Sequence, residues 1–138
     1  MPYPQPSSNH IGNKRLIDIS NTMTIIIVNM ARVVYRLIFA QQLFDHLRVI
    51  PRKHHAAVQI ALESLMQQPA TPTRNRKALR VPNTLNASWE LRFGEANEFR
   101  TFYQILPDEA ENEFIIFVIA VGFKEGNKLV IGLEEVTL

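Results

Sequence analysis

The alternation of apolar and polar residues first becomes regular at residues 33–39, where positions 33, 35, 37 and 39 are all apolar. A repeat of two with one apolar face predicts a β-strand. From residue 41 the spacing changes, and apolar side chains at positions 43, 44, 47 and 50 predict a helix over residues 41–50. Pro51 suits the first turn of a second helix, which ends near Gln68 because Pro69 cannot continue it. The two helices should form an antiparallel hairpin.

Four further strand-like segments follow a polar and basic stretch at residues 70–86, namely 87–93, 99–106, 114–121 and 128–136. Short runs rich in Gly, Asn, Pro and acidic residues separate them, as is typical of turns. Links of this length join antiparallel neighbours. The sequence therefore predicts an α+β fold in the order β-α-α-β-β-β-β. A helical hairpin should pack on a mainly antiparallel sheet of four to five strands.

Residues 1–30 differ in composition from the rest of the chain. Residues 1–13 hold three Pro and two Ser, a composition typical of disorder, and the apolar run at residues 25–28 is too short to assign as a strand. We therefore expect a flexible N-terminal extension over residues 1–30. A chain of 138 residues suits one domain, which we expect to span residues 31–138.

Charge is distributed unevenly along the chain. Residues 46–103 hold nine Lys or Arg against four acidic residues, whereas residues 104–138 hold two against seven. A basic middle segment predicts a face for a polyanion, and a solvated surface of mixed charge is the alternative. There is no cysteine, which excludes disulfides and thiolate metal ligands, and no apolar run reaches the roughly 18–20 residues of a membrane span. We expect no metal, no cofactor and no membrane partner.

Three of the predicted strands, at residues 87–93, 99–106 and 114–121, resemble a known family in their local sequence and in their order. Ser88–Arg92 (SWELR) resembles a strand of the RelE/ParE superfamily of bacterial toxins, with an aromatic residue, a polar one, Leu or Ile, and a basic one. Phe99–Ile105 (FRTFYQI) resembles the next strand of that family, an Arg-x-x-Tyr segment, and Phe117–Gly122 (FVIAVG) the one after it. The resemblance covers about residues 33–136, and the order and spacing of the segments are more specific than any one of them.

The resemblance implies the toxin of a type II toxin–antitoxin system, acting in the cytoplasm and held silent by a cognate antitoxin protein. RelE-like members are endoribonucleases that inhibit translation by cleaving mRNA on the ribosome, without a metal, through basic side chains of the sheet. By position, Arg92, Arg100 and Lys124 match such catalytic residues. The predicted 94–97 turn would bring the two arginines to one sheet face and one phosphate. The alternatives are that both arginines pair with glutamates on a solvated face and that Lys124 is an exposed turn residue.

The basic stretch after the helices is a second candidate for RNA contact. Four of its residues are predicted to bind phosphates, with a merely solvated loop as the alternative: Arg74, Arg76, Lys77 and Arg80. The ParE-like members of the superfamily instead inhibit DNA gyrase without cutting nucleic acid. Thr73–Leu79 (TRNRKAL) and Ile131–Glu135 (IGLEE) resemble that branch, and Glu90 stands where RelE-like RNases have a basic residue. An inactive relic that still binds an antitoxin is a third interpretation.

Overall fold

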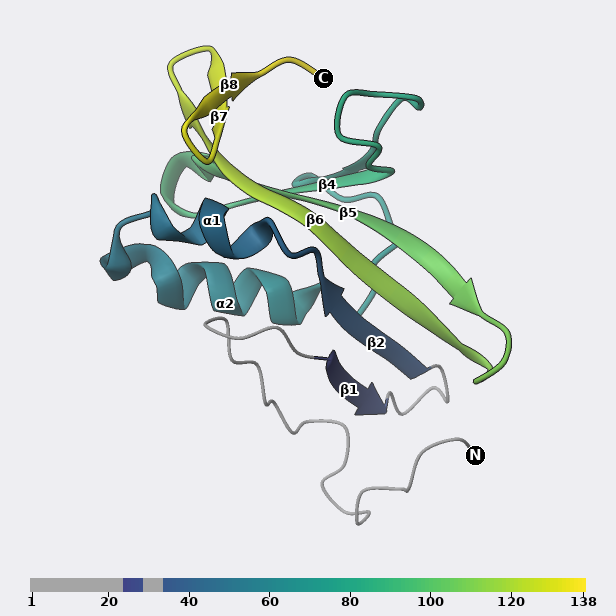
Figure 1. Cartoon of the computed structure of the whole chain (residues 1–138). Helices are drawn as coiled ribbons and strands as arrows, with labels where there is room; N and C mark the ends of the chain where they lie inside the picture. Colours follow the sequence, from purple (N-terminus) through teal and green to yellow (C-terminus); the bar gives the residue numbers. More distant parts are fainter. Residues whose placement is uncertain (1–23, 29–33) are drawn as a thin grey trace.

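The computed structural model describes residues 24–28 and 34–138, which form an eight-stranded sheet with helices on one face (Figure 1). Along the main path the strand order is β1-β2-β6-β5-β4-β3, and a hairpin of β7 and β8 extends from β6. Neighbouring strands are antiparallel except β2 and β6, which run parallel. The strands are β1 (Thr24–Val28), β2 (Val34–Phe39), β3 (Arg76–Ala78), β4 (Trp89–Phe93), β5 (Phe99–Asp108), β6 (Glu113–Glu125), β7 (Lys128–Ile131) and β8 (Glu134–Val136). The predicted α+β class and the mainly antiparallel sheet are confirmed.

The two predicted helices are present and shorter than expected. They are α1 (Leu43–Arg48) and α2 (His55–Ser64), with a short 3-10 turn at Arg52–His54 between them. The segment between the helices includes Pro51, which disfavours helical geometry at the residue before it. α2 ends at Ser64, short of the expected residue 68. The Ser64 hydroxyl donates to the carbonyl of Ala61 at 2.6 Å, a side-chain bond that competes with the next backbone bond of the helix.

The main hydrophobic core lies between the helices and the sheet. Its fully buried members include Leu43, Val58 and Leu62 from the helices and Tyr103 and Val118 from the sheet. Burial raises the pKa of the Tyr103 hydroxyl to about 12, with a nearby Arg76 acting against the shift. The neutral hydroxyl donates to the carbonyl of Pro69 at 2.6 Å, so Tyr103 ties β5 to the end of the helical segment.

A second, smaller core covers the opposite face of the sheet. It contains Phe102 and Ala120 from the central strands, and the loop that precedes β4 and the β7–β8 hairpin pack over it with Ala87 and Ile131. The loop and the hairpin are joined by a hydrogen bond of 2.6 Å from the Thr84 hydroxyl to the carbonyl of residue 137. The loop and the hairpin therefore stand above the strands as two walls on this face, and the site described below lies between them.

The sheet has more strands than the four to five predicted, for three local reasons. Thr24–Val28, inside the predicted extension, pairs with β2 as β1, while residues 1–23, 29 and 30 of that extension lie outside the described residues. Arg76–Ala78, predicted as loop, pairs with β4 as β3. The last predicted strand is broken into β7 and β8 at Gly132, whose φ of +66° turns the chain. The domain boundary at residue 30 stays a prediction.

Candidate nucleic-acid interface

Strands β4 and β5 place two arginines side by side at the centre of the sheet. Arg92 and Arg100 are direct partners in the antiparallel register, as the short turn between them predicts. Direct partners in such a ladder project from the same face. Strand β5 lies between β4 and β6, so Arg100 stands on a central strand held on both sides. The face is the one opposite the helices.

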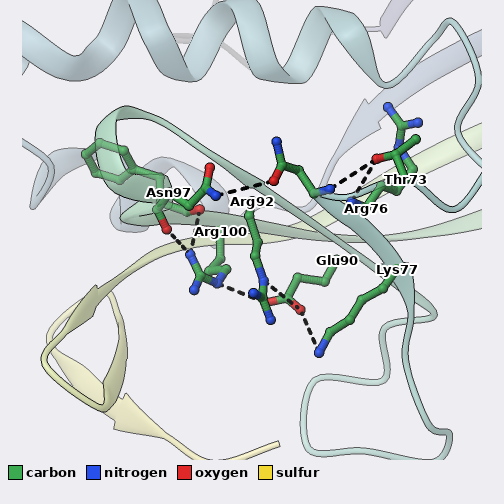
Figure 2. A network of polar contacts seen from close by, with 9 residues as sticks. Thr73, Arg76, Lys77, Glu90, Arg92, Asn97 and Arg100 are labelled. Atoms are coloured by element: carbon green, nitrogen blue, oxygen red, sulfur yellow. Dashed lines mark hydrogen bonds and ion pairs between the residues drawn. The ribbon is translucent and has the colours of Figure 1, made fainter.

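The carboxylate of Glu90 forms ion pairs with both arginines and with Lys77 (Figure 2). This carboxylate lies 3.1 Å from Nε of Arg100, 3.9 Å from Nε of Arg92 and 3.6 Å from Nζ of Lys77. The Glu90 side chain is 8% exposed, and the exposure of its partners rises from 10% for Arg100 through 39% for Arg92 to 55% for Lys77. Ion pairing with a glutamate, the alternative given above for both arginines, is thus observed. The carboxylate that the two arginines share is buried.

Arg100 is the most firmly held of the group. Besides Glu90, its Nη1 donates to the carbonyls of Asn97 and Phe99. The turn that offers the first carbonyl has left-handed backbone at Gly94, with φ of +88°, and at Asn97, with φ of +53°. Burial lowers the pKa of the Arg100 guanidinium from its usual value, and Arg92 adds to the lowering, while the Glu90 carboxylate opposes it.

The arginines form part of the lining of a pocket of about 500 Å³, which we call the basic basin. β4 and β5 contribute Glu90, Arg92 and Arg100; the loop before β4, the β6–β7 turn and the segment after β8 also contribute to the lining. Two of the lining side chains are carboxylates, from Glu90 and Glu135. Six are cationic: Lys77, Arg80, Arg92, Arg100, Lys124 and Lys128. The basin therefore has an excess of four positive side chains and a volume in the range of small-ligand sites.

Five of the seven predicted site residues line the basin, and Arg74 and Arg76 do not. Arg74 is exposed on the loop before β3. Arg76 pairs with Leu91, so it faces the helices, whereas its neighbour Lys77 pairs with Glu90 and faces the basin. Arg76 is buried, and its Nη1 donates to the carbonyl of Thr71 at 3.3 Å. Its observed contacts are therefore structural, within the helix-side layer.

Lys124 and Lys128 stand at the entrance to the β6–β7 turn and at its exit. Lys124 was predicted in a turn, but it belongs to β6 and pairs with Leu129, and its Nζ donates to the carbonyl of Asn127 at 3.2 Å. Lys128 was not among the predicted site residues. Its signal was present in the sequence, because a two-residue turn of Gly126 and Asn127 brings the residues on either side of it together.

The side chains that line the basin can hold anionic oxygens. Guanidinium groups present a planar fork that matches two phosphate oxygens, and lysines add mobile point charges around them. No group of three or more His, Asp or Glu residues that could hold a metal ion is found in the described part of the chain. Within residues 24–28 and 34–138 no helix is long and apolar enough to cross a membrane.

Comparisons of the chain with protein-family models, with curated proteins and with solved structures gave no match. The basin and the sequence segments described above are therefore the features that bear on function.

Proposed function

We propose that this protein is a toxin of the RelE/ParE type that binds RNA in the basic basin and inhibits translation by cutting mRNA on the ribosome. The observation that carries the proposal is the pair of directly opposed arginines, Arg92 and Arg100, on a rigid sheet within a basin of six cationic side chains. The succession of strand, two helices and further strands supports it, as do the sequence segments that resemble the family. The proposal places the protein in the cytoplasm, with an antitoxin as its partner.

The chemistry that such a site supports needs no metal. The 2′-oxygen of a ribose attacks the adjacent phosphorus, the bond to the 5′-oxygen breaks, and the products are a cyclic phosphate and a free 5′-hydroxyl. Negative charge grows on the phosphate oxygens in the transition state, so fixed cations lower its energy. Arg100 is the best placed of these, because its guanidinium is already oriented by Glu90 and by two carbonyls. Arg92 and Lys124 complete the proposed catalytic group.

A cell-free translation system free of DNA gyrase tests the proposal directly. The purified protein is expected to stop translation there and to leave shortened mRNA with 5′-hydroxyl ends. A supercoiling assay with purified gyrase, run in parallel, is expected to be unaffected. Full translation at saturating protein, with intact mRNA, would contradict the proposal.

A second candidate function is inhibition of DNA gyrase through a protein interface, as in ParE-like toxins. The observation in its favour is Glu90, a buried carboxylate at the floor of the basin where RelE-like RNases have a basic residue. In that case the supercoiling assay would show inhibition and the translation assay would not.

RNA binding by the basin is expected to depend steeply on salt and weakly on base identity. The lining consists of charged, amide, hydroxyl and aliphatic side chains, so the contacts run to phosphates. Neutralising about four phosphates gives a slope of roughly −3 in log K against log salt, or about 50-fold weaker binding between roughly 50 and 200 mM salt. Oligouridylate and oligoadenylate should bind with similar affinity, because contacts to phosphates carry no sequence information.

Two variants separate this expectation from a general effect of charge. Lys128→Gln, in the basin, should reduce the salt slope by about 0.7. Arg48→Gln removes an equal charge from helix α1, where Arg48 is exposed and paired with Asp45 at 2.6 Å, and should leave the slope unchanged. An equal effect of the two substitutions, measured by fluorescence anisotropy, would mean that the basin is not the binding site.

A further inference from the structure

The placement of Glu90 is unfavourable for an anion-binding site if it is considered alone. A carboxylate that lines the floor of the basin repels an incoming phosphate and offsets part of the charge that attracts it. Its side chain is also 8% exposed, and a charged group is rarely buried to this extent unless it is paired. Glu90 is paired with three cations, so the question is what this arrangement does for them.

The two arginines need an anion between them. Arg92 and Arg100 are direct cross-strand partners, and like charges directly opposite each other destabilise a sheet. Left unpaired, the two guanidinium groups would move apart. Glu90 lies two residues before Arg92 on the same strand face, and diagonally across from Arg100. From there one carboxylate oxygen meets Arg100 and the other meets Arg92 and Lys77.

Arg100 is oriented by contacts on two of its nitrogens. Nε donates to Glu90 at 3.1 Å, and Nη1 donates to the carbonyls of Asn97 and Phe99. The carbonyls fix one nitrogen, and the carboxylate fixes the rotation of the planar group about that point. Without Glu90, the guanidinium keeps its charge and its carbonyl contacts but loses a defined orientation toward the basin.

We propose that Glu90 is a positioning residue, whose carboxylate sets the orientation of Arg100, and secondarily of Arg92, toward a bound phosphodiester. The proposal rests on the proposed function for the identity of the ligand, and on the three ion pairs for the geometry. The proposal has a distinctive consequence, because the Glu90 charge opposes the attraction of a phosphate but improves the orientation of the arginines. Loss of the Glu90 charge should strengthen binding of RNA and weaken its cleavage.

The test uses Glu90→Gln in the full chain, with Glu134→Gln as the matched control. Both substitutions remove one negative charge and keep the size of the side chain, but Glu134 lies exposed on β8 and outside the basin lining. The first measurement is the Nε–H signal of Arg100 in NMR, assigned by its loss in Arg100→Lys. In Glu90→Gln this signal is expected to shift and to exchange faster with solvent. In Glu134→Gln it should stay as in the wild type.

The second measurement compares binding and cleavage. For Glu90→Gln, oligouridylate should bind at least as tightly as it does to the wild type, while mRNA cleavage on the ribosome falls by about 100-fold, the usual scale for a misplaced catalytic group. Glu90→Asp keeps the charge with a shorter reach, so its cleavage should be intermediate. This variant also decides the matter if Glu90→Gln does not fold.

The outcomes separate the two proposals. An unchanged Arg100 signal in Glu90→Gln overturns the positioning role whatever the protein does in cells. A changed signal with undiminished cleavage also overturns it, as does cleavage by Glu90→Asp that is no better than that of Glu90→Gln. Failure of the wild-type protein to bind or cut RNA would instead overturn the proposed function, and the NMR signal would still report whether Glu90 orients Arg100.

Discussion

Arg100→Ala is expected to abolish growth arrest in cells while the protein still folds. The guanidinium of Arg100 is the one cation of the basin that is both buried and fixed by neighbours, so it can stabilise developing charge without reorganising. Loss of one such donor typically costs about 10²–10³ in rate. The substitution leaves Glu90 with Arg92 and Lys77 as partners. We therefore expect a loss of about 1–3 kcal/mol in the free energy of unfolding, as for other polar groups that lose one partner.

Arg100→Lys distinguishes charge from geometry at the same position. Lysine keeps the positive charge but lacks the planar fork that can meet a phosphate and Glu90 together. Growth arrest should therefore be restored only in part. Arg48→Ala, on the exposed surface of α1, serves as the control and should arrest growth like the wild type.

The measurement is growth after induction at equal protein level, together with urea unfolding of each variant. Full arrest by a folded Arg100→Ala would show that Arg100 is not the functional cation. Loss of folding in Arg100→Ala with full arrest by Arg100→Lys would assign the residue a structural role.

The position of Arg92 and Arg100 was predictable from sequence because it depends on local geometry. A short turn fixes which residues of two strands stand opposite, and residues 94–97 contain a glycine that allows one. The apolar repeat of two likewise placed β2, the helical spacing placed α1, prolines bounded α2, and turn residues bounded β4 and β5. In each of these cases the information lies within a few residues of the position concerned.

Local sequence reasoning could not distinguish Arg76 from Lys77. Seen as members of a loop, both appeared equally able to bind phosphate. Once Arg76–Ala78 pairs with β4, neighbouring side chains must point to opposite faces, and only Lys77 faces the basin. Such a short polar segment has no hydrophobic repeat of its own, so its pairing depends on the strand beside it.

The basin itself depends on contacts between distant segments. Its walls meet where Thr84 donates to the carbonyl of residue 137, and the parallel pairing of β2 with β6 joins segments separated by both helices and three strands. Neither contact has a local sequence signal. The surroundings of Glu90 also depend on strand pairing, because the three cations that contact it come from β3, β4 and β5.

Gly122→Ala is expected to destabilise the protein strongly and to open one wall of the basin. Gly122 lies on β6 opposite Ile131 of β7. A methyl group added at Gly122 would lie 2.5 Å from the carbonyl oxygen of Val130 and 2.7 Å from Cγ1 of Ile131. The first of these atoms is backbone, so β7 must move away from β6 to relieve the contact. We expect a loss of about 2–3 kcal/mol in the free energy of unfolding, the upper part of the range for an overpacked site.

Gly126→Ala is the matched control for this substitution. Gly126 lies in the turn between the same two strands, and an added methyl group meets nothing within 4 Å. Its φ of +65° costs an alanine about 1 kcal/mol, so this variant reports backbone strain without a clash. Because β7 begins with Lys128, Gly122→Ala should also weaken RNA binding, whereas Gly126→Ala should bind like the wild type. Equal unfolding midpoints for the two variants in urea would show that β6 and β7 are not packed as closely as described, and equal RNA affinities would show that β7 does not form a wall of the binding site.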